Sequence, residues 1–402
     1  YLLSQRDERG LVVCTATGTG EQGICGWRNV MTGEQISGAV TEINSECYAA
    51  LVEAAALIAG TQPERAARYR READALKAAI NRHLVNPRTG LYLLNSEPGG
   101  AARTDVTADL VFPLIFNVAD DATAHLISTR LNSPDMMTSA GIRTVSTQNP
   151  YYHPDRVSGL MGGVWPGVTW WYATGNSLDD PRIMVESLRH SYRQYLRNPR
   201  VYNTVPGQFS EWFHGESLVN RGMRLSPWEP PRFLWSMIEG ALGIAHHGES
   251  FTITPHIPPA WTWLAVGDFP YRGRAYSWFM MRMAGQRTFF TATPFKSEDE
   301  VRCYDDEVRE GVALIGDHAC AHAYRRGREL LVALGSESRY KAPVMIELSP
   351  AVLRPERQYT LSVYTSELDT WDELGARAGG DLQRLSIWVE KQGAVLLQFV
   401  EH

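Results

Sequence analysis

The sequence lacks the features that would direct the chain to a membrane or to nucleic acid. No apolar run approaches the roughly 20 residues that a membrane-spanning helix needs. The 402 residues carry a formal net charge of −6, which disfavours phosphate backbones and anionic lipid surfaces as partners. We therefore expect neither a nucleic-acid partner nor a membrane partner, and the sequence leaves the oligomeric state open.

Cysteine and metal-binding motifs are also scarce. The five cysteines are an odd number without paired metal-ligand spacing, and His246, His247 and His256 lack the spacing of a zinc protease helix. No GxSxG nucleophile elbow is present. We expect no cofactor, no metal and a cytoplasmic location. The chain begins at Tyr1 rather than Met, so we also expect sequence upstream, where a signal peptide could have been lost.

One glycine-rich stretch resembles a dinucleotide-binding fingerprint. Residues 18–23 satisfy GxGxxG, and Glu42 follows about 20 residues later. The fingerprint requires a helix that begins within the glycines, so that its N-terminus meets the pyrophosphate. Residues 24–29 contain a further glycine and no helical period, which argues against nucleotide binding.

Apolar residues recur at helical spacing through the first 245 residues. The spacing predicts an αα-hairpin that turns at Gly60, with a capping box at 61–64 opening its second helix. Apolar helices alternating with charged ones are typical of an α/α toroid, (α/α)6, built from six hairpins. About seven helices are too few to close it, so we expect the remainder upstream of Tyr1. The further helices are expected at 105–116, 120–131, 162–172, 181–196 and 230–242.

After Gly243 the period changes to that of strands. We expect a β-sandwich domain over residues 246–402, following a helical domain over residues 1–245. A hairpin turn is expected at 391–393. The expected strands are 251–254, 276–283, 288–293, 344–348, 359–364 and the two halves of 385–400.

The segment 209–244 places a carboxylate, Glu211, among the aromatic residues Phe209, Trp212 and Phe213. Aromatic rings beside a fixed acid are typical of a sugar-binding cleft, because rings stack on pyranose faces and the acid performs the chemistry. The alternative is a solvated loop that precedes a core helix.

Four stretches, in order, resemble the α/α six-hairpin glycosidases over about residues 1–245. Residues 39–51 read AVTEINSECYAAL, residues 137–145 read MTSAGIRTV and residues 162–166 read GGVWP; Glu211 followed by Trp228 completes the series. The likeness is closest to the amylo-α-1,6-glucosidase domain of glycogen debranching enzymes, with kinship to glycoside hydrolase families 63, 37 and 15. The resemblance implies hydrolysis of an α-glycosidic bond in an oligosaccharide with inversion, by an acid and a base on opposite faces.

In this resemblance Glu211 matches the family's general base, whereas the general acid departs from the pattern. The family has an Asp two residues after a Trp, and this chain has Asn29 after Trp27 and Arg28. Asn cannot donate a proton as a carboxylic acid does. We expect Glu42 to take the role; Asp7, Glu21 or Asp105 are alternatives, or the domain does not hydrolyse by this route.

Further residues are predicted to bind the substrate. Trp27, Trp165 and Trp228 are either stacking platforms or core aromatics, and Arg143 either binds sugar hydroxyls or fixes its own loop. Asp105 is either a substrate ligand or a helix N-cap, and Arg28 and Asn29 complete the set. Besides an inverting hydrolase, two alternatives stay open: a transferase or phosphorylase on the same scaffold, and a non-catalytic carbohydrate-binding protein.

Overall fold

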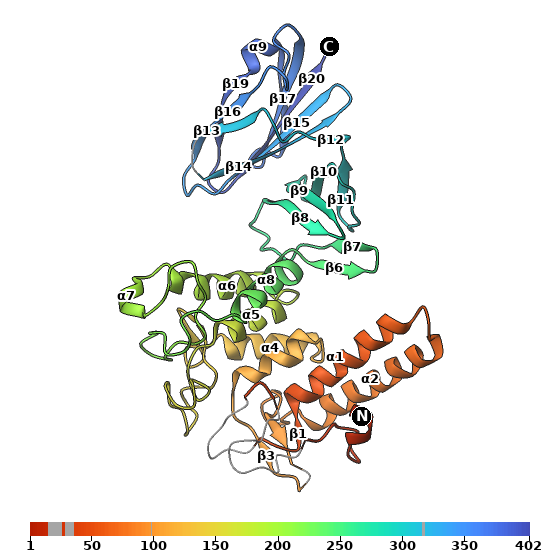
Figure 1. Ribbon diagram of the computed structural model, residues 1–402, viewed down its shortest axis with the longest axis vertical. Coiled ribbons are helices and arrows are strands. Elements are labelled where there is room, and N and C mark those ends of the chain that lie inside the picture. The colour runs from red at the N-terminus through yellow and green to blue at the C-terminus, as the bar shows by residue number, and fades with distance from the viewer. Residues whose placement is uncertain (15–25, 29–35, 98, 316–317) are drawn as a thin grey trace. The chain divides into compact units, whose positions relative to one another are not determined.

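The chain folds into two compact units, Tyr1–Leu242 and Gly243–His402 (Figure 1). The computed structural model describes residues 1–14, 26–28, 36–97, 99–315 and 318–402. The first unit is mainly helical and the second is mainly β-structure, so the predicted order of a helical domain followed by a β domain is confirmed. The closure of the helices into a toroid stays a prediction.

The first unit opens with the αα-hairpin that the sequence predicts. Helix α1 (Thr41–Ile58) is followed after a short turn by α2 (Pro63–His83) (Figure 1). Pro63 opens α2 because a helix's first residue needs no amide hydrogen. The predicted capping box is wrong: Gln62 is the N-cap, and the Thr61 hydroxyl donates to the Ile58 carbonyl at 3.4 Å.

The apolar run that begins at Asp105 forms a shorter helix than predicted. A 3₁₀ turn, η2 (Ala108–Leu110), leads into α3 (Val111–Ile115). The Thr107 side chain caps this turn by accepting from the Asp109 amide, so the N-cap role suggested for Asp105 is wrong. The left-handed conformation of Asn117, with φ of 53°, turns the chain away after α3.

Other helices of the first unit begin where capping residues and prolines predict. Asp120 caps α4 through the Thr123 amide at 2.8 Å, and Pro166 and Pro181 are the first residues of α5 and α6. No helix in the described part of the chain is long and apolar enough to cross a membrane. The remaining bounds are α4 (Asp121–Leu131), α5 (Pro166–Gly175), α6 (Pro181–Tyr195), α7 (Pro199–Tyr202), α8 (Glu229–Trp235), the π-helix η3 (Ser236–Ala241) and η1 (Leu2–Gln5).

Short strands complete the first unit. They pair in the order β1-β2-β3 and as the pair β4-β5. Their bounds are β1 (Ala39–Val40), β2 (Asn95–Ser96), β3 (Ala102–Arg103), β4 (Met137–Thr138) and β5 (Gly141–Ile142).

The second unit contains a four-stranded sheet (β11-β10-β9-β8), a six-stranded sheet (β12-β14-β15-β20-β17-β18), a three-stranded sheet (β13-β16-β19) and the pair β6-β7 (Figure 1). A short helix, α9 (Gly379–Leu382), precedes β19. The strands are β6 (Ile244–His247), β7 (Ser250–Ile253), β8 (Trp263–Tyr271), β9 (Arg274–Met283), β10 (Gln286–Thr291), β11 (Glu300–Cys303), β12 (Asp306–Glu307), β13 (Val312–Ile315), β14 (Ala319–Arg326), β15 (Glu329–Ser336), β16 (Ala342–Leu348), β17 (Gln358–Thr365), β18 (Thr370–Ala378), β19 (Arg384–Val389) and β20 (Ala394–Glu401).

The six-stranded sheet is covered on both faces. Along β15, Leu330, Val332 and Leu334 belong to the core shared with β16 and β19. The intervening Leu331 and Ala333 belong to the core shared with β9 and β10. Successive strand residues point to opposite faces, so a continuous apolar run is what a central strand buried on both sides requires.

The predicted hairpin at 391–393 is wrong. Strand β19 pairs with β16, whereas β20 pairs with β15 and β17. The turn therefore carries the chain from the three-stranded sheet to the six-stranded sheet. Two strands that are adjacent in sequence with a tight turn need not pair when each has a better partner elsewhere.

Candidate active site

The Glu42 carboxyl lies beneath the backbone of Gly26 and Trp27. Glu42 belongs to the first turn of α1 and is only 3% exposed. Its Oε1 accepts a hydrogen bond from the Trp27 amide at 2.7 Å. A Cβ at Gly26, whose φ is +144°, would lie 2.2 Å from Glu42 Oε2. Only glycine permits this close approach at this position.

The surroundings of Glu42 favour its protonated form. Burial raises the pKa of this carboxyl well above its usual range, and the negative charge of Asp109 raises it further. A carboxylic acid that keeps its proton near neutral pH has the property that a general acid needs. Glu42 therefore has the chemistry of a proton donor in the described geometry.

Asp109 joins Trp27 and Arg28 in a buried network. Its Oδ1 accepts from the Trp27 indole nitrogen at 2.8 Å and its Oδ2 from Arg28 Nε at 2.8 Å. The other Arg28 nitrogens donate to the carbonyls of Leu160 and Thr144. All three nitrogens of this predicted substrate ligand thus donate to protein acceptors. Sequence reasoning missed Asp109; the available signal was a lone carboxylate inside an apolar run.

Tryptophan rings connect this network to helix α8. The ring centroid of Trp27 lies 6.0 Å from that of Trp165 and 6.2 Å from that of Trp171, both in edge-to-face geometry. The Arg232 guanidinium carbon lies 4.6 Å from the Trp171 ring centroid, within cation–π range. The rings of Trp27, Trp165 and Trp171 therefore bridge the start of α1 and the start of α8.

A second buried carboxyl, Glu229, stands at the start of α8. It is fully buried, and its Oε1 lies 3.1 Å from Arg232 Nη1. The backbone amide of Gly167 also faces this carboxyl and acts to lower its pKa. Burial raises the pKa of Glu229 to about 8 against the lowering effect of Arg232, and the charge of Glu211 adds to the rise. Sequence reasoning missed Glu229 as well, although it directly follows Trp228.

Glu211 is half-buried beside Glu229. Its backbone amide donates to the Met223 carbonyl, and its Oε2 accepts from the Met223 amide at 2.9 Å. The Met223 amide therefore holds the carboxylate in place. Because the charge of Glu211 acts on the pKa of Glu229, the two carboxyls are electrostatic neighbours.

The structure places the other predicted ligands as follows. The Trp228 side chain, just before α8, is 41% exposed, and the Trp165 indole nitrogen donates to the Ser158 carbonyl at 3.2 Å. Arg143 donates to the carbonyls of Gly215 and Pro134, each at 3.0 Å.

The Asp105 carboxylate lies between two side chains. Its Oδ2 is 3.1 Å from Arg103 Nε, and its Oδ1 accepts from the side-chain amide of Asn149 at 2.7 Å.

Some predicted residues fall outside the described part of the chain: Asn29, Glu21 and the glycines of residues 18–23. The alternative acid Asp7 accepts from the amides of Arg9 and Leu11 and pairs with the Arg9 side chain. Within the described residues, no group of three or more His, Cys, Asp or Glu side chains could hold a metal ion.

Residues 25–217 match the family model of the mannosylglycerate hydrolase MGH1-like glycoside hydrolase domain. The resemblance to the six-hairpin glycosidases is thereby confirmed, and the matching residues lie within the first unit. A comparison with curated protein sequences finds no match.

Two solved structures with TM-scores just above 0.5 share the fold at low sequence identity, and a third similar structure has a lower TM-score. A sialidase is 14% identical over 74% of this chain and 29% of its own, with a TM-score of 0.53. The GH78 family rhamnosidase of Bacillus sp. GL1 is 20% identical over 75% of this chain and 29% of its own, with a TM-score of 0.51. The GH63 mannosylglycerate hydrolase of Thermus thermophilus is 16% identical over 51% of this chain and 47% of its own, with a TM-score of 0.40. This chain thus spans less than half of the length of each.

Proposed function

We propose that the protein is an inverting glycoside hydrolase that cleaves an α-glycosidic bond in an oligosaccharide, with glucosidase-like and glycogen-debranching-like specificity. Residues 1–245 are the C-terminal portion of an (α/α)6 toroid in this proposal. The observation that carries it is the raised pKa of the buried Glu42 carboxyl within a segment that matches a glycoside hydrolase domain.

The two carboxyls take complementary roles. Glu42 is the general acid that protonates the leaving oxygen, because its burial keeps the proton on the carboxyl. Glu211 is the general base that activates a water on the opposite face of the sugar. The Met223 amide bond to one carboxylate oxygen of Glu211 supports this role by fixing its orientation.

Trp228, Arg143 and Asp105 are the predicted residues that contact the sugar in this proposal. Trp228 has the most exposed ring among the three predicted platforms and is the one that stacks on a pyranose face. Trp27 and Trp165 form the wall behind the acid, and Arg143 and Asp105 position hydroxyl groups at the rim.

A matched pair of variants tests the base assignment. Glu211→Gln is expected to abolish turnover of aryl α-glycosides and α-linked oligosaccharides, because the amide cannot accept the proton of the attacking water. Glu216→Gln, which changes an exposed acid on the same loop, is expected to keep full turnover. Proton NMR of the first product formed is expected to show the inverted anomer. Retained activity in Glu211→Gln would sink the assignment.

Two observations favour a second function, a carbohydrate-binding protein without hydrolysis. Glu42 is nearly inaccessible, and the position of the family's acid is occupied by Asn29. Binding of an oligosaccharide to the wild-type chain without release of any product over days would favour this function. Release of sugar phosphate that depends on added phosphate would instead identify a phosphorylase.

A further inference from the structure

A cavity of about 300 Å³ lies within the second unit, between the four-stranded and six-stranded sheets. We call it the Trp371 cavity. Its apolar floor is made by Phe290, Leu331 and Tyr304, which are almost completely buried. Its size is at the lower end of small-molecule sites, which span about 300–1,000 Å³. A ligand the size of one sugar ring fits such a volume, and a longer chain would extend out of it.

One wall of the Trp371 cavity carries a partly exposed indole. Trp371 belongs to β18 and is 39% exposed, and its ring centroid lies 5.5 Å from that of Tyr364 on the paired strand. The neighbouring ring holds the indole in place while leaving part of it accessible. A fixed, accessible aromatic face is what the C–H face of a pyranose stacks on.

The polar groups of the cavity are fixed by one another. Glu329 accepts from the Gln398 amide at 2.9 Å and from the Tyr304 hydroxyl at 3.3 Å through one oxygen, and from Arg326 at 3.0 Å through the other. These bonds fix the orientation of three donors before any ligand arrives. Fixed polar groups of this kind cost a ligand little reorganisation, which favours binding.

The charges of the cavity cancel. Glu300 pairs with Arg302 at 2.9 Å, and Glu329 pairs with Arg326. Two carboxylates and two guanidinium groups leave no net charge to attract an anion or a cation. The surface therefore offers donors and acceptors of both kinds, which suits the hydroxyl groups of a neutral sugar.

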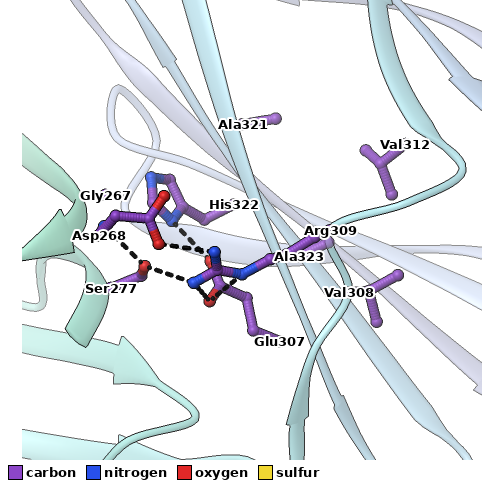
Figure 2. A pocket seen from close by; sticks show the side chains of 10 residues that line it. All are labelled: Gly267, Asp268, Ser277, Glu307, Val308, Arg309, Val312, Ala321, His322 and Ala323. Carbon is purple, nitrogen blue, oxygen red and sulfur yellow. Dashed lines mark hydrogen bonds and ion pairs between the residues drawn. The ribbon is translucent and has the colours of Figure 1, made fainter. Parts of the chain in front are cut away.

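A second cavity of the same unit, about 290 Å³ in volume, provides a contrast. Figure 2 shows Arg309 between Asp268 and Glu307, with Ser277 and His322 beside them. The Arg309 guanidinium nitrogens lie 2.6 Å from Asp268 Oδ1 and 2.8 Å from Glu307 Oε2. Its lining contains no tryptophan, tyrosine or phenylalanine. Without an aromatic platform, this cavity offers no comparable surface for a sugar ring.

We propose that the Trp371 cavity is an accessory site that binds one neutral pyranose unit of an oligosaccharide. The proposal does not depend on hydrolysis by the first unit, since none of its residues belongs to that unit. In this arrangement the second unit holds a carbohydrate on its own, by stacking on Trp371 and by hydrogen bonds to the fixed groups around Glu329.

Calorimetry on the full chain tests the site. The probes are maltotetraose, mannotetraose and a rhamnose oligosaccharide, with a glucuronic acid oligosaccharide as the charged comparison. The Glu211→Gln background prevents turnover during the measurement. Trp371→Ala is expected to weaken the binding of a neutral probe by about tenfold or more, which is the loss of one stacking contact. The charged probe is expected to bind more weakly than the neutral one.

The control is Trp388→Ala, which removes another exposed tryptophan, 60% accessible, from β19 outside the cavity. In the Glu211→Gln background, Trp388→Ala is expected to leave the affinity for the neutral probe unchanged. Arg302→Ala, a change at a partly exposed cavity residue, is expected to weaken binding as Trp371→Ala does.

The proposal is overturned if no neutral probe binds, or if the Trp371→Ala and Trp388→Ala variants bind the neutral probe with equal affinity. In the wild-type background Trp371→Ala is expected to keep the turnover of a small aryl glycoside. Loss of turnover in Glu211→Gln with Trp371-dependent binding intact would support both proposals separately. Full turnover in Glu211→Gln would refute only the catalytic one.

Discussion

Two buried carboxyls of the first unit and two carboxyls of the second unit have pKa values shifted in opposite directions. In the first unit, burial raises the pKa values of Glu42 and Glu229, and neighbouring carboxylates raise them further. In the second unit, hydrogen bonds from Arg302 and Arg354 lower the pKa values of Glu300 and Glu401. In the second unit, Glu300 and Glu401 are thus stabilised in their ionised form by ion pairs. In the first unit, ionisation of Glu42 or Glu229 costs free energy, because each is buried.

The difference separates structural acids from candidate catalytic ones. A chain that needed only a folded scaffold would place an apolar side chain at Glu42, because a buried acid beside Asp109 contributes nothing to stability when it is charged. Perturbed carboxyls gathered beside tryptophan rings and a buried arginine are typical of functional sites. The comparison therefore predicts that changes at the first unit's acids affect activity more than fold, and the following variants test it.

The largest effect is expected from Glu42→Gln. Loss of a general acid lowers kcat by about 10²–10⁴-fold, while the glutamine keeps the shape of the protonated acid and still accepts from the Trp27 amide. Steady-state kinetics on an oligosaccharide and on a substrate with an activated leaving group are the measurement. The activated substrate is expected to lose much less activity, because its leaving group needs little protonation.

Glu401→Gln in the second unit is the control and is expected to keep kcat, since Glu401 pairs with the exposed Arg354 and lies outside the lining of the Trp371 cavity. If Glu42→Gln lost folded structure, as judged by circular dichroism, or kept full activity on both substrates, the acid role would be wrong.

The next largest effect is expected from Arg28→Met. The change leaves Asp109 buried without its cation, and loss of one partner of a buried pair costs about 3–5 kcal/mol. Arg309→Met removes a cation that is about half exposed from Asp268 and Glu307, and is expected to cost no more than about 1 kcal/mol. Urea titration of both variants measures the free energy of unfolding. Equal losses would break the contrast between the two units.

Helix positions were predictable from sequence because their determinants are local. Asp120 and the prolines at 166 and 181 act on the first turn of their own helices. The turn at 391–393 was misjudged because strand pairing depends on β16 and β15, which lie far away in sequence.

Among the candidate site residues, Glu42 was singled out from sequence only through a family resemblance, and Asp109 and Glu229 were missed. What marks these carboxyls is their burial and the charged groups that lie near them, which are properties of the folded chain. A carboxylate in an apolar run was the one local signal for Asp109. The roles given to Glu211 and Glu42 stay predictions until variants are measured.

The smallest effect is expected from Glu229→Gln and appears in the pH dependence of stability. The folded-state pKa of Glu229 is raised from 4.5 to about 8. The stabilisation that it provides is therefore fully present below pH 4.5 and is lost as the pH rises through about 8. The glutamine has no proton to lose, so the variant is expected to be more stable than the wild type by roughly 1–3 kcal/mol above pH 8.

Unfolding by urea at pH values from 4 to 9 measures this difference. For Glu300→Gln, the change in the free energy of unfolding is expected to have the opposite sign. The pKa of Glu300 is lowered, mainly by the hydrogen bond from Arg302, so its stabilisation is present above the ordinary pKa and lost as the pH falls. Removing it is expected to lower stability slightly at neutral pH and to have no effect in acid. Because the two carboxyls differ in burial and not in chemistry, a shared sign for the two variants at pH 8 would show that burial does not control their titration.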